Sequence, residues 1–308
     1  MSRLPALALA LSLSALPADA EEPPAKPELL EVRKIWDRDP HSAFTDLIRH
    51  DGKWFCAFRA GKGHVSPDGA LQVLTSADGE AWEPIARVTS RTADLRDPKL
   101  WVTPDGRLMM TAAAALHQPA EHKHQTMAWF SRDGKEWGAG VPVGEPDCWL
   151  WRVTWHEGAA YGFGYRTAGE QFVRLYRSGD GKTFDTLVGK AFAEGYPNET
   201  SLVFAGDVAY CLLRRDGEPN TGLLGTAKAP FKDWDWKDLG VRLGGPKMLR
   251  LPDGRAFAVV RLYSPKVRTA LCEVDLGAGT IREVLPLPSG GDTSYAGLVW
   301  HGGLLWVS

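Results

Sequence analysis

The chain has 308 residues, a formal net charge of −2 and 13 tryptophans. A nearly neutral chain excludes binding to nucleic acid through bulk positive charge. The tryptophans favour packed β-sheets and surfaces on which sugars stack, and a chain of this length can bury a large core.

The N-terminal segment has the features of a secretory signal peptide. Arg3 supplies a positive charge, residues 4–16 are largely apolar, and Ala18-Asp19-Ala20 is a cleavage site of the A-x-A type. The apolar stretch is too short to span a membrane, and no later stretch reaches that length. We therefore expect a signal peptide over residues 1–20, a disordered leader over 21–28, and a secreted or periplasmic protein without a membrane span.

Six similar turns recur along the rest of the chain, and each precedes an apolar or alternating strand. The intervals between them are 54, 52, 49, 47 and 49 residues. The turns are Asp51-Gly52, Asp105-Gly106, Glu157-Gly158, Gly206-Asp207, Asp253-Gly254 and Gly302-Gly303. A period of about fifty residues is typical of a propeller with four-stranded blades.

A second turn has the pattern Ser-x-Asp-Gly-x-x-aromatic. It occurs at Ser76–Trp82, Ser131–Trp137 and Ser178–Phe184, each time after a strand pattern. Asp-Gly suits a tight turn, because glycine accepts positive φ and the aspartate side chain can accept hydrogen bonds from the turn amides. These turns are expected to join the third and fourth strands of a blade and to be structural.

The two repeats predict an all-β fold over residues 29–308: a six-bladed β-propeller of four-stranded antiparallel blades. The sixth unit ends at Ser308, within its second strand, so the last blade is expected to be truncated, with residues 29–36 supplying its outer strand. Three of the four cysteines fall in apolar strand patterns, which favours buried free thiols over disulfides.

The first strand of each blade lines the central channel, so its first residues should meet the end of the second strand at one mouth. This mouth collects carboxylates and arginines, which are typical of sites that bind sugars and acids. The candidate binding residues are Asp46, Arg59, Arg96, Asp97, Arg152, Arg214, Arg215 and Asp292.

The aspartate turns and six repeats resemble the sialidase superfamily. Asn198-Glu199-Thr200-Ser201, followed by Leu212-Leu213-Arg214-Arg215, resembles the segment that carries a glutamate and a substrate-binding arginine. The resemblance implies Glu199 and Arg215, with Arg214 as the neighbouring candidate. Ser264–Arg268 resembles the segment of another binding arginine, Arg268. Ser294-Tyr295 resembles that of the nucleophilic tyrosine, Tyr295.

In this scheme Glu199 takes the proton of Tyr295, whose hydroxyl attacks the sugar. The first blade departs from the family, because residues 43–46 lack the expected arginine, for which Arg59 or Arg96 could substitute. The acid/base position falls near His64, with Asp68 four residues later.

The sequence therefore predicts an exported sialidase-like glycoside hydrolase that cleaves terminal, including acidic, sugars from glycans. Two alternatives stay open: a non-catalytic carbohydrate-binding propeller, and a lyase of acidic polysaccharides that uses His64 and a tyrosine. We expect a monomer that needs no cofactor. We also expect no metal, since the spacing of His117, Glu121, His122 and His124 is not a standard zinc pattern.

Overall fold

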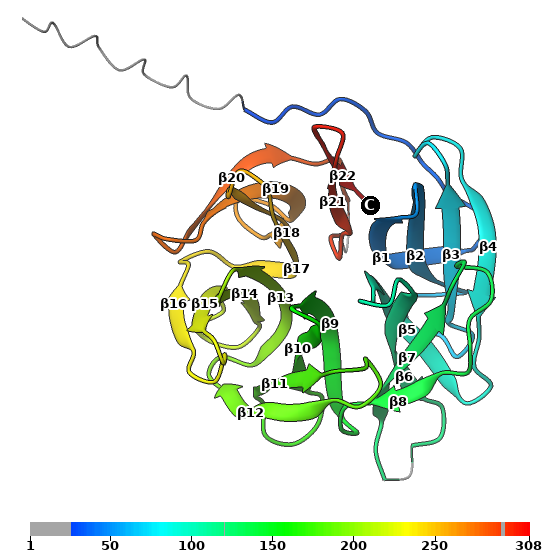
Figure 1. The fold of residues 1–308 in the computed structure, drawn as a ribbon, viewed down its shortest axis with the longest axis horizontal. Coiled ribbons are helices and arrows are strands. Elements are labelled where there is room, and N and C mark those ends of the chain that lie inside the picture. Colours follow the sequence, from blue (N-terminus) through cyan, green and yellow to red (C-terminus); the bar gives the residue numbers. More distant parts are fainter. Residues whose placement is uncertain (1–25, 120, 291–292) are drawn as a thin grey trace, which may run out of the picture.

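The computed structural model describes residues 26–119, 121–290 and 293–308. The chain forms a ring of antiparallel sheets around a common central axis, as Figure 1 shows. The ring is an all-β propeller, as the repeats predict. The expected signal peptide lies outside the described residues.

Five sheets are four-stranded blades, and in each the strands follow one another in chain order. The first blade consists of β1 (His41–His50), β2 (Lys53–Gly61), β3 (Ala70–Ser76) and β4 (Glu83–Val88). The second blade consists of β5 (Ala93–Val102), β6 (Leu108–Leu116), β7 (His124–Ser131) and β8 (Val141–Val143). The third blade consists of β9 (Cys148–His156), β10 (Ala159–Arg166), β11 (Val173–Ser178) and β12 (Asp185–Phe192). The fourth blade consists of β13 (Pro197–Ala205), β14 (Val208–Arg215), β15 (Leu223–Lys228) and β16 (Asp235–Asp238). The fifth is β17 (Leu243–Arg250), β18 (Ala256–Leu262), β19 (Arg268–Asp275), β20 (Thr280–Pro286).

The expectation of six four-stranded blades is wrong, because the described chain has five. The sixth repeat forms a two-stranded sheet of β21 (Leu298–His301) and β22 (Leu304–Val307), which lies between the fifth and first blades (Figure 1). Residues 29–36 form no strand beside it. Ile35 and Trp36 instead pack on the first blade, where the rings of Trp36 and Phe58 are 5.7 Å apart.

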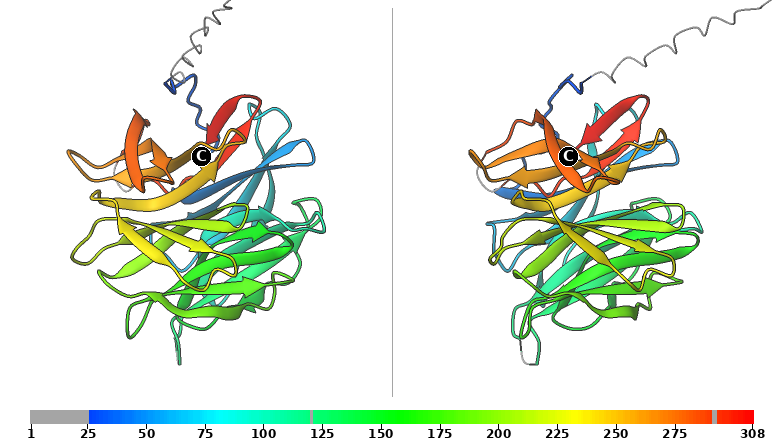
Figure 2. Two further views of the ribbon diagram at one scale, coloured as in Figure 1. Left: turned by 60° about the vertical axis from the view of Figure 1, so that its left-hand side comes forward. Right: turned by 90° about the vertical axis from the view of Figure 1, so that its left-hand side faces the viewer.

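Both kinds of turn occur where the sequence predicts them. The six marker turns join the first and second strands of their sheets, and the three aspartate turns join third to fourth strands. In the third blade, Asp180 Oδ1 accepts hydrogen bonds from the amides of Lys182 and Thr183, both at 2.8 Å. The right-hand view in Figure 2, turned by 90° from Figure 1, shows the ring of blades from its edge.

The innermost strands share a feature that builds the channel mouth. The pairing register of β1, β5, β9, β13 and β17 with their neighbours is interrupted by a bulge near the mouth. A bulge bends the strand and redirects the side chains beside it. Phe44 and Asp97, with φ of 61° and 53°, lie in two of these bulges.

The core lies between adjacent blades, as hydrophobic clusters that join neighbouring sheets. All four cysteines are buried and unpaired, as predicted. Among the described residues, no helix has the length and apolarity to cross a membrane.

Candidate functional site

A cavity of about 500 Å³ opens at the mouth where the bulges lie. This volume is within the range typical of small-molecule sites, about 300–1,000 Å³. Its walls combine three carboxyl groups with aromatic rings and histidines. The principal lining residues are Phe44, His64, Asp94, Arg96, Asp97, His117, His124, Trp149, Trp151, Tyr165, Glu199 and Tyr295.

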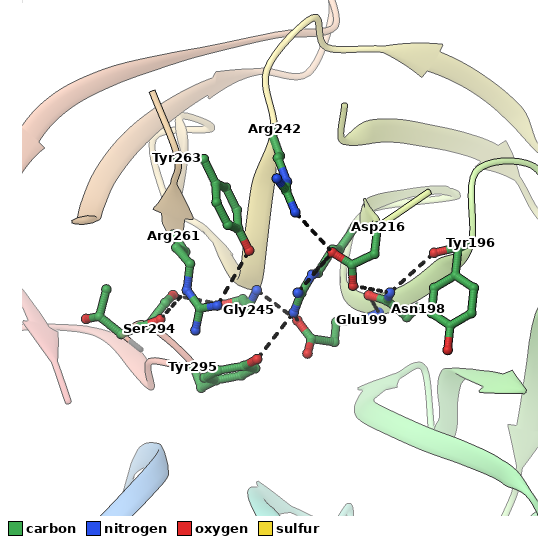
Figure 3. A network of polar contacts seen from close by, with 12 residues as sticks. Tyr196, Asn198, Glu199, Asp216, Arg242, Gly245, Arg261, Tyr263, Ser294 and Tyr295 are labelled. Atoms are coloured by element: carbon green, nitrogen blue, oxygen red, sulfur yellow. Dashed lines mark hydrogen bonds and ion pairs between the residues drawn. The ribbon is translucent and has the colours of Figure 1, made fainter. Parts of the chain in front are cut away.

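Glu199 lies at the centre of a polar network on one side of the pocket (Figure 3). Its Oε2 accepts hydrogen bonds from Arg214 at 2.8 Å and from the amide of Gly245 at 2.9 Å. Gly245 has a φ of 56°, and a Cβ there would lie 2.8 Å from the amide nitrogen of Tyr295, so this approach needs glycine. Among the described residues, Glu199 Oε1 accepts no hydrogen bond.

The guanidinium of Arg214 joins the glutamate to the tyrosine. Its Nη1 donates to Glu199 and, at 3.2 Å, to the hydroxyl of Tyr295, while Asp216 accepts from its Nε at 3.1 Å. Within the described chain, no direct hydrogen bond joins Tyr295 to Glu199. The predicted tyrosine and glutamate therefore share one pocket, and an arginine connects them.

The phenol of Tyr295 is held in its protonated form. Burial and the nearby carboxylate of Glu199 raise its pKa above the ordinary value, against the attraction of Arg214 and Arg261. Tyr295 and Ser294 have positive φ, 66° and 88°, which aims the tyrosine ring into the pocket against Phe44 and Trp151. A buried neutral phenol is a hydrogen-bond donor first and a nucleophile only after it loses its proton.

Asp97 forms a second acidic position in the pocket. It is 4 % exposed, and burial raises its pKa to about 6, in spite of the cations Lys99, Arg96 and Arg59. Arg96 lies between two carboxylates, 4.0 Å from Asp97 and 3.5 Å from Asp94. Asp97 thus keeps its proton to a higher pH than an ordinary aspartate.

Aromatic rings cover the remaining wall. Trp149 and Tyr165 stack with their centroids 5.9 Å apart at 14°, and Trp151 meets Tyr295 edge-on at 5.9 Å. Such faces suit the apolar side of a sugar ring. His64 and Tyr295 both pack edge-on against Phe44, with ring centroids 5.3 and 5.1 Å from its own.

Below the pocket, a buried ion pair crosses the central channel. Arg152 donates to Asp46 at 3.0 Å and to the carbonyl of Ala296 at 2.8 Å. Asp46 also accepts from the amide of Leu100. Burial would raise the pKa of Asp46, but Arg152, Lys247 and Lys99 outweigh it and hold that pKa below its usual value.

Several residues predicted for the site lie outside the pocket. Arg59 is fully buried, where it binds Asp94 at 2.9 Å and carbonyls of the 63–66 loop. Arg215 points to the opposite face of its strand and binds Thr221 and Asp238. Arg268 pairs with Glu283 on the third and fourth strands of its blade.

The remaining residues predicted for the site lie in a surface loop, below the pocket or around the cavity. Asp68 is exposed and accepts a hydrogen bond from the amide of Lys62, so it stabilises the loop. Asp46 and Arg152 support the channel below the pocket. Asp292 lies outside the described residues. Asp97, Arg96, Arg214, Glu199, Tyr295 and His64 come together around the cavity.

Asp94, Lys99, Gly245 and the Trp149–Tyr165 pair were not predicted as site residues. The alternation of side chains between the two faces of β5 predicts the direction of Lys99 only if the bulge before this residue is known. The described residues contain no cluster of histidine, cysteine, aspartate and glutamate that could hold a metal ion.

No family model matches the sequence, and no curated protein matches it. Solved structures do share the fold. A protein of unknown function from Dyadobacter fermentans is 20 % identical with a TM-score of 0.72, over 87 % of this chain and 89 % of that one. An α-L-arabinofuranosidase from Fusarium graminearum is 16 % identical with a TM-score of 0.65, over 86 % of each chain.

A thermostable family-43 glycoside hydrolase is 13 % identical with a TM-score of 0.55, over 82 % of this chain and 96 % of that one. These findings correct the resemblance to the sialidase superfamily, because the named neighbours are arabinofuranosidase and family-43 enzymes and the chain has five four-stranded blades. At these identities the likeness shows the fold alone, an all-β propeller.

Proposed function

We propose that the protein is a glycoside hydrolase that removes a terminal sugar from a glycan in the channel-mouth pocket. The observation that carries the proposal is the contrast between two carboxyl groups in one cavity. Glu199 is paired with a guanidinium, whereas burial keeps a proton on Asp97 up to a pH of about 6. Glycosidases need one carboxyl group as an acid and another as a carboxylate.

In this scheme Asp97 donates its proton to the leaving oxygen of the glycosidic bond. The free oxygen of Glu199, which Arg214 and Gly245 do not engage, takes a proton from a water molecule, and the water oxygen bonds to the anomeric carbon as the glycosidic bond breaks. The hydroxyl of Tyr295 and the aromatic wall orient the sugar. The sequence-based assignment of Tyr295 as nucleophile, with Glu199 as its base, is the competing scheme in the same pocket.

The charge balance of the pocket favours a neutral sugar. Arg96 lies 3.5 Å from the carboxylate of Asp94, and Arg214 is paired with Glu199 and Asp216. A carboxylated sugar would need a guanidinium that its neighbours leave available. Solved neighbours with this fold are named as an α-L-arabinofuranosidase, an α-L-arabinanase and a β-1,3-galactosidase, and their substrate names guide the choice of test compounds.

The test is hydrolysis of nitrophenyl glycosides of arabinofuranose, xylose and galactose, with a uronic acid glycoside for comparison. We expect release of nitrophenol from at least one neutral glycoside, and loss of release in Asp97→Asn and Glu199→Gln. Asp253→Asn, in an exposed turn, is the matched control. Absence of turnover, together with saturable binding of oligosaccharides, would instead identify a carbohydrate-binding propeller.

A lyase is the second candidate, because His64 and Tyr295 both line the pocket and both pack against Phe44. An acid and a base on two sides of a sugar ring could eliminate across its C4–C5 bond. Acidic polysaccharides would then give an unsaturated product that absorbs ultraviolet light, and a hydrolase would give none.

We also propose that the protein is exported and acts as a monomer. The predicted signal peptide supports export. Cell fractionation and the mass of the recovered protein test it, since cleavage after Ala20 should place the mature form outside the cytoplasm.

A further inference from the structure

A buried cation below the pocket has no part in the proposed chemistry so far. Lys99, on β5, has no exposed surface, and within the described chain its Nζ has no hydrogen-bond partner. An ammonium group ordinarily donates three hydrogen bonds, and its removal from water costs several kcal/mol unless nearby charges compensate. Whether the side chain of Lys99 carries its positive charge therefore depends on the charged groups around it.

The bulge in β5 places this cation directly under the site. The register shifts between Arg96 and Lys99, and Asp97 within the bulge has a φ of 53°. Asp97 consequently lines the pocket, while the side chain of Lys99 does not line it and is fully buried. The Nζ of Lys99 lies 5.1 Å from the ring centroid of Trp151, and that ring forms the pocket wall beside Tyr295.

The charges near Lys99 belong largely to the proposed site. Asp97, Asp46 and Glu199 attract it, and Arg152 repels it. Burial and Arg152 lower the pKa of Lys99 to about 7 despite these carboxylates. In the opposite direction, the positive charge of Lys99, like those of Arg96 and Arg59, favours ionisation of Asp97.

We propose that Lys99 is a positioning residue, whose buried charge governs how tightly Asp97 holds its proton without touching the substrate. The proposal rests on the proposed function, in which Asp97 is the acid. It assigns the pH range of activity to a side chain in the channel, on the far side of the pocket wall.

Other titratable and charged groups around Asp97 also influence its pKa. They are Asp94 and Arg96 on β5, Arg59 on β2, Asp46 on β1, Arg152 on β9, Tyr165 on β10, Glu199 on β13, Arg214 on β14, and His64, His124 and Tyr295 at the pocket rim. None of them changes in the variants proposed below, so a shift in the titration of Asp97 reports on position 99.

Lys99→Met removes the charge and keeps a long side chain. Without the cation, the ionised form of Asp97 loses a favourable interaction and its pKa rises. An acid then stays protonated to higher pH, so the basic limb of the kcat/KM profile should move up by about one pH unit, the low end of what a close charge produces. Lys99→Arg keeps the charge and should leave the limb in place.

Lys247→Met is the matched control. Lys247 is also buried in the channel, with its Nζ 4.5 Å from the ring centroid of Trp101, but its charge acts on Asp46 and Arg152. Its loss should leave the basic limb unchanged. If Lys99→Met does not fold by circular dichroism, Lys99→Gln removes the charge with a polar side chain.

The second readout needs no substrate. In protein labelled with 13C at aspartate carboxyl groups, the signal absent from Asp97→Asn identifies Asp97, and its titration midpoint can be followed by NMR. We expect a higher midpoint in Lys99→Met and an unchanged one in Lys99→Arg. Equal midpoints in the two variants would overturn the proposal. If no glycoside is hydrolysed, the proposed function fails, and the NMR titration still decides the role of Lys99.

Discussion

At the level of single residues, the buried carboxyl group of Asp97 lowers the stability of the folded protein at neutral pH and supplies the proton of the proposed reaction. Its pKa of about 6 in the folded chain exceeds the value of about 3.9 expected when unfolded. Folding stability that depends on Asp97 is therefore greatest below pH 4 and falls as the pH rises from about 4 to 6. A residue that costs stability at neutral pH suggests a functional reason to keep it there.

Asp97→Asn should separate these effects. We expect kcat to fall about 10²- to 10⁴-fold, because the general acid is lost. At pH 8 the free energy of unfolding should rise by about 1–3 kcal/mol, since a buried charge has been removed. Hydrolysis assays and urea unfolding measure the two quantities. Unchanged activity would remove Asp97 from the mechanism, and lower stability at pH 8 would contradict its raised pKa.

Glu199 and Tyr295 are distinguished by a pair of conservative variants. Glu199→Gln should lower kcat at least about 10³-fold, because it removes the carboxylate of the reaction. Tyr295→Phe removes one hydroxyl that Arg214 holds at 3.2 Å, and should lower kcat only about tenfold. Single-turnover kinetics give both values. A loss in Tyr295→Phe as large as in Glu199→Gln would support the tyrosine nucleophile instead.

Sequence patterns grouped Glu199 and Tyr295 with Arg215 and gave Arg214 as the neighbouring candidate, whereas in the structure Arg214 contacts both Glu199 and Tyr295. The local pattern does not reveal which of the two arginines faces the pocket, because neighbouring residues on a strand point to opposite faces. The choice depends on the register between β13 and β14, which the bulge near Pro197 shifts. Arg268 was assigned from a local motif, which carries no information on its partner Glu283 across the blade.

At the level of elements, turns were the most predictable feature. Asp-Gly and similar pairs determine local backbone geometry through glycine at positive φ, and Gly52, Gly106, Gly158 and Gly181 all adopt it. The bulges of the inner strands were not predicted, since they arise from the meeting of strands at the channel. They nevertheless decide which side chains face the pocket.

Asp180→Ala tests the structural role of the aspartate turns. The change removes an acceptor for the amides of Lys182 and Thr183 and for Ser178. The free energy of unfolding should fall by only about 1 kcal/mol, because the turn is exposed and water replaces part of each bond. Activity on glycosides should be unchanged. A selective loss of activity without loss of stability would show that the turns take part in function.

At the level of the whole molecule, the period of about fifty residues predicts a propeller, but the way in which the ring closes is tertiary information. The sheet of β21 and β22 packs against the first blade through a close approach. A Cβ at Gly297 would lie 2.1 Å from the amide nitrogen of Leu47. Ser308 adds hydrogen bonds to Gly297 and to Thr45. The contacts of Gly297 with Leu47 and of Ser308 with Thr45 join residues 250 or more positions apart, beyond the reach of local patterns.

Asp46 stabilises the ring from its centre, and its removal gives the last prediction. It joins β1 to Arg152 on β9 and to the amide of Leu100 on β5, so one carboxylate connects three blades. Asp46→Asn leaves Arg152, Lys99 and Lys247 without their common counter-charge. The free energy of unfolding at pH 7 should therefore fall by about 3–5 kcal/mol, the usual result of breaking a buried pair. Asp185→Asn, at an exposed strand end, is the control.

The pH dependence of this difference identifies its cause. The pKa of Asp46 is lowered in the folded protein, so its stabilisation is complete above the unfolded value of about 3.9 and is lost as the pH falls toward the folded value. The gap between the parent protein and Asp46→Asn should accordingly narrow below pH 4. Urea unfolding at pH 7, 5 and 3 measures it. A gap that stays constant over this range would mean that Asp46 acts through packing, and that charge does not hold the blades together.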